Sequence, residues 1–291
     1  MDVTADDRKE LERVRRQLEE VTTERDKLLA ENRRLHRDRS ISPQEPGKVS
    51  LSPASVRPDS SPVTGKQATG SLIVNNESPL SEKVRLFRSL FRGREDVFAR
   101  LWWSQKSQRV GYSPVCRREW NPAWCDKPRV KCGACPNQDY TPVTDEVIQG
   151  HLEGSHTIGI YPLLSDETCC LLAADFDKQS WKEDAAAFLE TCCQMDIPAV
   201  IERSRSGNGA HVWIFFSEAV PASAARKLGC YLLTETMTRR HQLGMDSYDR
   251  LFPNQDNLPK GGFGNLIALP LQKVPAEKDN TLFPERDLET S

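Results

Sequence analysis

The stretch CCLLAADFDKQSW, residues 169–181, joins an unbroken apolar run to two carboxylates at its end. A short apolar run of this kind is typical of a buried strand. Because residues i and i+2 of a strand face the same side, Asp175 and Asp177 are expected to point at one spot. Two like charges held together repel unless a cation lies between them, so the pair is a candidate metal site. The alternative is an ordinary strand end followed by an Asp-rich turn.

The composition of the chain excludes several classes of protein. With 291 residues and a formal net charge of −2 it has no overall basic signal for nucleic acid, so any nucleic-acid surface must be local. No run of about 18 apolar residues is present, and we expect no membrane span. The N-terminus lacks the apolar core of a secretory signal. Nine cysteines without such a signal indicate the reducing cytoplasm, where clustered cysteines favour a metal site.

Residues 1–38 and 39–79 differ in character from the rest of the chain. The first segment is highly charged and carries an apolar residue every seventh position, which predicts a coiled-coil helix. The positions of this repeat are Val14, Val21, Leu28 and Leu35. Since a lone helix of this length is marginal in water, we expect a homo-oligomer, the alternative being a solvated helix without a partner. The second segment is dense in Ser and Pro and predicts a disordered linker.

Residues 80–275 have the pattern of a folded domain, and a tail follows at 276–291. Strand-like runs alternate with helical runs, which predicts an α/β or α+β domain. The strand-like runs are 157–163, 169–175, 199–203, 211–216 and 265–269. The helical runs are 80–103, which Gly93 divides into two short helices, 181–195 and 221–241.

The segment VCRREWNPAWCDKPRVKCGACPNQ holds four cysteines in a C-x8-C-x6-C-x2-C spacing. They are Cys116, Cys125, Cys132 and Cys135. A CxxC knuckle wraps readily around one metal and two further thiolates complete a tetrahedron, so 116–135 is predicted to be a loop that holds a structural Zn²⁺. Replacement of one thiolate by His151 or His156 is an alternative, and so is a chance CxxC with one of the other two cysteines in the core. The remaining five cysteines lie in apolar runs and are expected to be buried.

The segment IERSRSGNGAHVWIFF, residues 201–216, predicts a strand, a polar turn and a second strand. The SGNG turn can present successive backbone N–H groups as an anion-binding nest, flanked by two arginines and a histidine. This combination suits a triphosphate, and the alternative is an ordinary hairpin with a hydrogen-bonded histidine. The candidate nucleotide-binding residues are Arg203, Arg205, Ser206, Gly207, Asn208, Gly209 and His211.

Taken together, the DFD strand end and the SGNGAH turn resemble the archaeo-eukaryotic primase superfamily, whose first two motifs are an apolar strand ending in Asp-x-Asp or Asp-x-Glu and a small-x-His turn. The longer matches are similar to the primase-polymerase domain of TOTE conflict systems, and they fall within residues 80–275. They are GIYPLL (159–164), AADFDK (173–178), ERSRSGNGAHVWIFF (202–216), SYDRLFPNQD (247–256) and GGFGNLIALPLQ (261–272). The resemblance implies an α+β fold with an RRM-like catalytic core that carries the cysteine loop.

The resemblance also implies a third acid, in a motif in which an apolar residue precedes Asp or Glu. The candidates are Asp249, which lies inside the best-matching block, Asp246, which follows Met245, and Asp256. We rank Asp249 first. The implied cofactors are Mg²⁺ or Mn²⁺, held by this acid together with the two carboxylates of the DFD motif, and the structural Zn²⁺ of the cysteine loop.

The function implied by the resemblance is template-directed nucleotidyl transfer, as a DNA primase, a DNA polymerase or both. The substrates would be nucleoside triphosphates and a single-stranded nucleic-acid template, in conflict with mobile elements or in their replication. Primases of this group are associated with a superfamily II helicase, and the chain contains no GxxxxGK[ST] motif, so a helicase would be a separate partner. The alternative is a non-catalytic nucleic-acid-binding module or a scaffold that recruits a helicase or nuclease. The acid pair opposes that alternative, because carboxylates repel a phosphate backbone unless metal intervenes.

Overall fold

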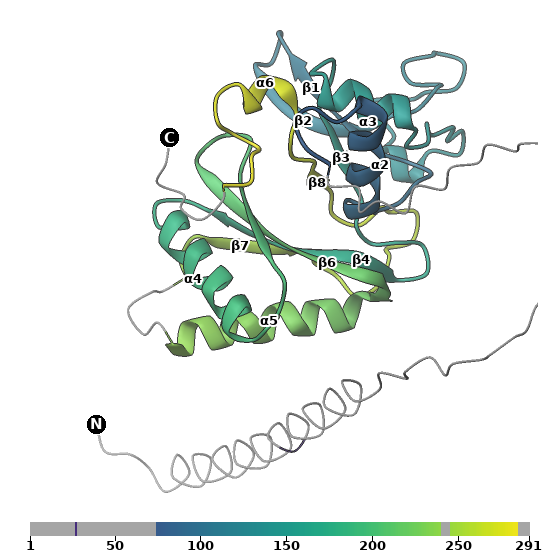
Figure 1. The fold of residues 1–291 in the computed structure, drawn as a ribbon. Coiled ribbons are helices and arrows are strands. Elements are labelled where there is room, and N and C mark those ends of the chain that lie inside the picture. The colour runs from purple at the N-terminus through teal and green to yellow at the C-terminus, as the bar shows by residue number, and fades with distance from the viewer. Residues whose placement is uncertain (1–26, 28–73, 240–244, 285–291) are drawn as a thin grey trace, which may run out of the picture. The chain divides into compact units, whose positions relative to one another are not determined.

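The computed structural model describes Lys27 and residues 74–239 and 245–284 (Figure 1). The chain divides into two compact units, residues 1–69 and 70–291. The predicted coiled coil at 1–38 and the predicted linker as far as residue 73 lie outside the described residues, apart from Lys27. Both therefore stay predictions. No helix in the described part of the chain is long and apolar enough to cross a membrane.

The second unit contains two four-stranded sheets in which every strand pairing given for the described residues is antiparallel. The first sheet has the order β2 (Arg109–Pro114), β1 (Ala99–Ser104), β3 (Ile158–Ile160), β8 (Ile267–Ala268). The second has the order β5 (Val200–Arg203), β6 (Gly209–Pro221), β4 (Thr168–Asp177), β7 (Tyr248–Phe252). Of the two predicted fold classes, the structure is therefore α+β.

The helices fall into two groups around these sheets. The helices are α2 (Leu80–Leu90), α3 (Asp145–Leu152), α4 (Trp181–Gln194), α5 (Ala222–Arg239) and α6 (Lys273–Ala276), with a short 3-10 turn at Cys132–Ala134. Helices α4 and α5 cover one face of the second sheet (Figure 1). The chain order β4-α4-β5-β6-α5-β7 makes this half a βαββαβ unit, in keeping with the expected catalytic core.

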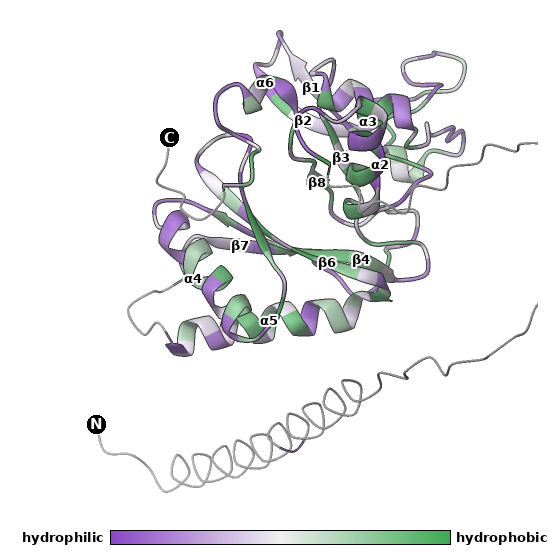
Figure 2. Ribbon diagram, in the orientation of Figure 1, coloured by the Kyte–Doolittle hydropathy of each residue, from purple (hydrophilic) through white to green (hydrophobic). Residues whose placement is uncertain are grey.

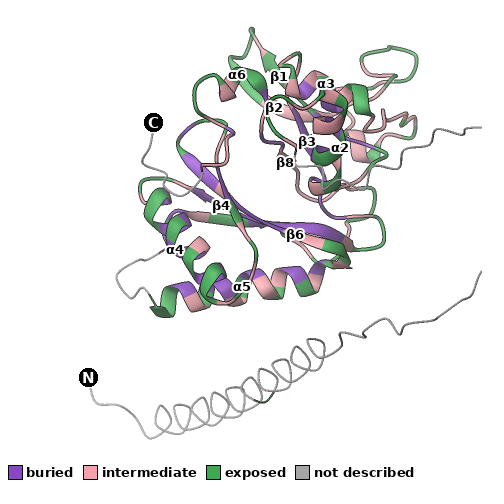
Figure 3. Ribbon diagram, viewed as in Figure 1, coloured by how far each residue is buried: buried purple, intermediate pink, exposed green. Residues whose placement is uncertain are grey.

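The second sheet is buried on both faces because its central strands are apolar on both. Leu172, Ala174 and Phe176 of β4 pack with α4 and α5, whereas Leu171 and Ala173 pack into a second core shared with α2, β3 and β8. Figure 2 shows β4 and β6 as mainly hydrophobic, and Figure 3 shows the same strands as mainly buried. The polar end of β4 is therefore the exception on an otherwise apolar strand.

Several sequence predictions are corrected by the structure. The helical spacing read across residues 94–103 is wrong, because Ala99–Ser104 forms β1, which is hydrogen-bonded to β2 and to β3. Pairing with partners distant in sequence outweighs local periodicity here, and the Trp-rich composition suits a strand. Strands β2 and β7 and helix α3 were not predicted. Of the five cysteines expected to be buried, Cys193 and Cys230 are exposed.

His151 ties α3 to the C-terminal part of the domain. Its side chain is fully buried, its Nε2 lies 2.8 Å from the carbonyl oxygen of Pro270, and the N–H of Ile158 donates to its Nδ1 over 3.2 Å. Because Nδ1 accepts a hydrogen bond, the imidazole is neutral and Nε2–H is the donor to Pro270. Burial lowers the pKa of His151 from its usual 6.5 to about 4.

This depressed pKa predicts a loss of stability in mild acid. Above pH 6.5 the imidazole is neutral in both the folded and the unfolded chain, whereas below it only the unfolded chain takes up the proton. The free energy of unfolding should therefore fall by about 3 kcal/mol as the pH drops from 6.5 to 4. Urea denaturation at several pH values should show this slope in the wild type and a shallower one in His151→Gln. Parallel slopes would contradict the assignment.

Candidate active site

Asp175 and Asp177 lie at the end of β4, between β6 and β7. Asp175 is directly opposite His211 on β6 and opposite Arg250 on β7. Phe176, between the two acids, turns to the other face and packs against Phe188 of α4 with a ring distance of 5.6 Å. The strand period therefore places both carboxylates on the face away from α4 and α5, as the sequence predicted.

An irregularity in β7 brings Asp249 beside this pair. Asp175 pairs with Arg250 and the next residue, Phe176, pairs with Tyr248, so Asp249 is the extra residue of a bulge. The charge of Asp249 acts on Asp175, and its Oδ2 accepts a hydrogen bond from Arg250 Nε over 2.5 Å. Bulges of this kind re-aim a side chain, which is why a residue in a neighbouring strand can reach the end of β4.

The other two candidates for a third acid are placed differently. Asp246 is exposed and precedes β7, and it is not among the charges that shift the pKa of Asp175. Asp256 forms an ion pair of 2.6 Å with Arg226 of α5. Of the three acids, the geometry therefore brings Asp249 to the DFD motif.

Burial and neighbouring charges shift the pKa of Asp175. Burial raises the pKa of Asp175, the negative charges of Asp249 and Asp177 raise it further, and His211 and Arg250 oppose the shift. Oδ1 of Asp177 is buried and has no hydrogen-bond partner among the described residues. A buried carboxylate oxygen without a partner is costly, and a cation would relieve that cost. In the described part of the chain, however, no three or more His, Cys, Asp or Glu side chains are arranged as a ready-made metal site.

Sequence reasoning missed Glu202, which holds His211 in place. Glu202 is almost fully buried on β5, and its Oε2 accepts hydrogen bonds from His211 Nδ1 over 2.8 Å and from Trp213 Nε1 over 2.9 Å. This leaves His211 Nε2 directed towards Asp175, 3.5 Å from Oδ1. The available signal was a lone Glu within the strand-like run 199–203, where an acid needs a partner.

The pKa of His211 follows from these neighbours. Burial lowers it, but the charge and hydrogen bond of Glu202 and the charge of Asp175 together outweigh burial, so the net pKa is raised above its usual value. The imidazole is thereby favoured as a cation beside the acids. A cation held in this position suits an anionic ligand.

The SGNG turn connects β5 to β6 near these residues. The N–H of Gly207 donates to the carbonyl oxygen of Ser204 over 2.9 Å, and the N–H of Asn208 donates to Ser206 Oγ over 3.2 Å. Two donors of the expected anion nest are thus already used within the turn. Arg203 Nε donates to the carbonyl oxygen of Gly207 over 3.2 Å, whereas Arg205 is exposed. The anion nest stays a prediction, and the two arginines differ in role.

A buried network fixes the segment that leads into β7. Asp184 of α4 accepts hydrogen bonds from Ser180 Oγ over 2.9 Å and from Ser247 Oγ over 2.6 Å. The carbonyl oxygen of Ser247 in turn accepts from the backbone N–H of Asp177 over 2.7 Å. Helix α4, the end of β4 and the start of β7 are therefore joined through one serine, and this sets where the bulge begins.

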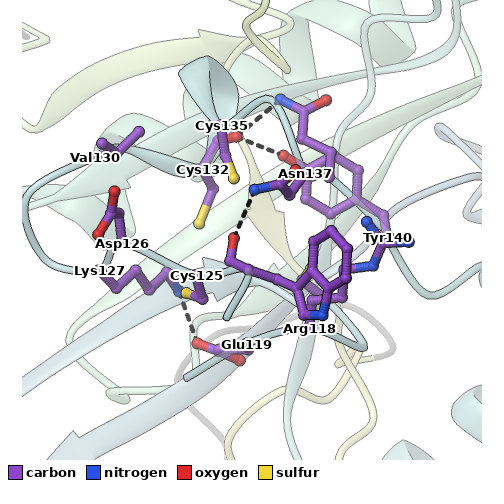
Figure 4. Close-up of a pocket in the computed structure, with 13 residues that line it drawn as sticks. Arg118, Glu119, Cys125, Asp126, Lys127, Val130, Cys132, Cys135, Asn137 and Tyr140 are labelled. Atoms are coloured by element: carbon purple, nitrogen blue, oxygen red, sulfur yellow. Dashed lines mark hydrogen bonds and ion pairs between the residues drawn. The ribbon is translucent and has the colours of Figure 1, made fainter. Parts of the chain in front are cut away.

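The four cysteines of the 116–135 loop line one small cavity of about 20 Å³ (Figure 4). All four are partly exposed and none forms a disulfide. Burial raises the pKa of Cys132, the nearby Lys127 opposes that shift, and Cys116 adds to it. The knuckle is packed against residues 259–264, because a Cβ on Gly133 would lie 2.4 Å from the carbonyl oxygen of Gly261. The cavity has room for a single small occupant.

The two histidines considered as alternative zinc ligands make other contacts. Both ring nitrogens of His151 are hydrogen-bonded in the core, to Pro270 and to Ile158. His156 Nε2 lies 2.8 Å from the carbonyl oxygen of Val147. Neither side chain lines the cysteine cavity, so neither histidine is a candidate ligand there.

Comparison with known proteins places the chain in a family. The family model described as TOTE conflict system, Archaeo-Eukaryotic Primase domain, matches residues 82–291, and no curated protein matches the chain. Among solved structures, the polymerase domain of Mycobacterium tuberculosis Ligase D in complex with DNA is similar at 12% identity and a TM-score of 0.40, covering 72% of this chain and 83% of that one. A likeness this low says nothing about the site. Because the family model spans well over half of the chain, the protein belongs to the archaeo-eukaryotic primase superfamily, within its TOTE conflict system group.

Proposed function

We propose that the protein is a template-directed nucleotidyltransferase, acting as a DNA primase, a DNA polymerase or both. It would join nucleoside triphosphates on a single-stranded nucleic-acid template. The observation that carries the proposal is the position of Asp175, flanked by His211 on one strand and by the Asp249 bulge on the other. Membership of the primase family supports the reaction class.

The acids suit Mg²⁺ or Mn²⁺ in chemical type, since both ions prefer carboxylate and phosphate oxygens. Asp175, Asp177 and Asp249 would hold the metal, and the unpartnered Oδ1 of Asp177 is the structural feature that fits it. When bound, such a metal neutralises phosphate charge and activates the attacking hydroxyl. The chain itself contributes carboxylates gathered on one face of the sheet before any substrate arrives.

His211 is proposed to contact the triphosphate of the incoming nucleotide. Glu202 orients the ring through Nδ1, which leaves Nε2–H free to donate towards the acids and their ligand. Exposed Arg205 is available to add a second positive charge, while Arg203 supports the turn from within. These residues would orient the phosphates, because in-line transfer is slow when the phosphorus is poorly aligned.

The competing function is a non-catalytic nucleic-acid-binding module, or a scaffold that recruits a helicase or nuclease. Such a protein has no need for a buried carboxylate pair, which costs stability when no cation is bound. The present proposal also includes a superfamily II helicase as partner, self-association through residues 1–38 and a role in conflict with mobile elements. They rest on the family and on the sequence pattern.

The acids are tested by conservative replacement. Asp177→Asn should lower nucleotide incorporation on a primed single-stranded template in Mg²⁺ by about 100-fold or more, since several kcal/mol of charge stabilisation is lost. Asp249→Asn should behave alike, whereas Asp246→Asn and the surface control Asp256→Asn should stay close to wild type. Wild-type incorporation by Asp177→Asn would refute the metal site. Loss of activity in Asp246→Asn but not in Asp249→Asn would reassign the third acid and leave the site in place.

Replacement of His211 is expected to alter the kinetic constants differently from replacement of the acids. His211→Ala removes a charge-assisted donor to the triphosphate, so the KM for the nucleotide should rise by about tenfold to 100-fold. The kcat should fall less than in Asp177→Asn, because the metal ligands remain. Steady-state kinetics with varied nucleotide concentration measure both constants. An unchanged KM would remove His211 from the nucleotide site.

A structural zinc in the cysteine loop is the second part of the proposal. The four thiols line one cavity, which Glu119 and Asp126 also line, although the sulfur atoms are not in ligating positions as they stand. Zinc binding would draw the thiolates inwards and deprotonate them, which reverses the raised pKa of Cys132. Four protein ligands would leave no open position for catalysis.

Metal analysis of the purified full chain should find about one zinc ion per chain. Cys132→Ser should lose that zinc and lower the melting temperature, whereas Cys193→Ser, a matched change at an exposed thiol outside the loop, should keep both. Zinc retained in full by Cys132→Ser, or absent from active wild-type protein, would overturn the assignment.

A further inference from the structure

Three of the six tryptophans of the chain gather on one exposed groove. Trp102 is 42% exposed, Trp103 59% and Trp120 65%, and all three line a cavity of about 790 Å³ between the β1–β2 hairpin and the cysteine loop. Single exposed apolar residues are ordinary on a protein surface, but a cluster of large aromatic ones marks a binding surface.

The backbone is shaped to hold these indoles at the surface. Trp102 lies over Gly111 of the paired strand, where a Cβ would come within 2.7 Å of the ring. Trp120 has a φ of 61°, a left-handed conformation that a bulky residue seldom adopts, and Lys127 Nζ lies 5.6 Å from its ring centre. Neither arrangement serves the hydrophobic core, because both rings remain open to solvent.

The groove lies in the basic part of an otherwise slightly acidic protein. Residues 99–135 contain eight Lys or Arg and only two acidic residues, whereas the whole chain has a net charge of −2, so positive charge is concentrated here. Lys127 is ion-paired to Glu119 over 2.6 Å. Arg100 and Lys131 also line the groove and have no ion pair with any described residue. These two cations are free to meet an anionic ligand.

One residue of the groove, Tyr112, interacts with residues of the candidate active site. This residue of β2 lines the groove, and burial raises its pKa while the positive charge of Arg205 in the SGNG turn opposes that shift. The charge of Glu202, the partner of His211, also acts on Tyr112. A polymer lying in the groove would therefore continue towards the turn proposed to hold the nucleotide.

We propose that this groove binds the single-stranded template, with unpaired bases stacked on Trp102, Trp103 and Trp120 and with phosphates near Arg100 and Lys131. Base stacking on aromatic rings beside a positively charged path is how proteins hold single strands without reading their sequence. A nucleic acid fits better than an apolar peptide because the aromatic rings are interleaved with unpaired cations. The identification of the bound strand as a template rests on the proposed function, whereas binding of the strand requires no catalysis.

The test is fluorescence anisotropy of the full chain with a labelled oligothymidylate, without nucleotide or divalent metal, at two salt concentrations. Trp103→Ala and Trp102→Ala should each weaken binding by about tenfold, and Lys131→Gln should weaken it and reduce its salt dependence. The wild-type chain should bind the single strand more tightly than a duplex, and the strand should quench tryptophan fluorescence. Ribo- and deoxyribo-oligonucleotides run in parallel show which sugar is preferred.

Trp124→Ala is the matched control, since Trp124 is 49% exposed, lies in the same loop and does not line the groove. It should bind as wild type, because it removes no groove residue. Wild-type affinity in both Trp102→Ala and Trp103→Ala, at unchanged melting temperature, would overturn the groove while leaving the proposed catalytic site intact. Equal losses in Trp124→Ala, or tighter binding of duplex, would also overturn it.

Discussion

Strand β4 is hydrogen-bonded to β6 on one side and to β7 on the other, and it is buried on both faces as far as Ala174. This double burial fixes the position of the two carboxylates at its end. The strand cannot slip by one residue without moving Phe176 out of the α4–α5 core and the acids into it. The free energy of the apolar core thus holds two like charges close together, against their repulsion, at the open end of the sheet.

The strands beside β4 determine what the carboxylates can do. From β6 comes His211, whose raised pKa depends on a buried Glu202 that lies on the next strand out. From β7 comes Asp249, which reaches the pair only because the strand bulges between Arg250 and Tyr248. Each neighbour therefore adds one group to the site, a histidine on one side and a third carboxylate on the other. A hydrogen bond from Ser247 to Asp184 joins the residue just before β7 to α4.

The cysteine cavity and the tryptophan groove share lining residues, so a change in the shape of one would change the shape of the other. Glu119, Lys127 and Cys132 line both. If zinc organises the cysteines, the same loop closure sets the positions of Trp120 and Lys131 on the groove side. A structural metal would then act on template binding through shape, with no direct contact to nucleic acid. This would give the loop a function that its distance in sequence from the DFD motif does not suggest.

The sequence by itself determined the features that depend on local pattern, and only the tertiary structure decided those that depend on pairing between distant residues. The apolar run before Asp175 predicted a buried strand with both acids on one face, and the motifs predicted the family to which the chain belongs. Strand β1, by contrast, was taken for a helix, since periodicity does not record the hydrogen bonds that β2 and β3 supply. Glu202 became the partner of His211 through the register of β5 with β6, and a bulge in β7 separated Asp249 from Asp246. A sequence lists which side chains are available, but the register of a sheet decides which of them meet.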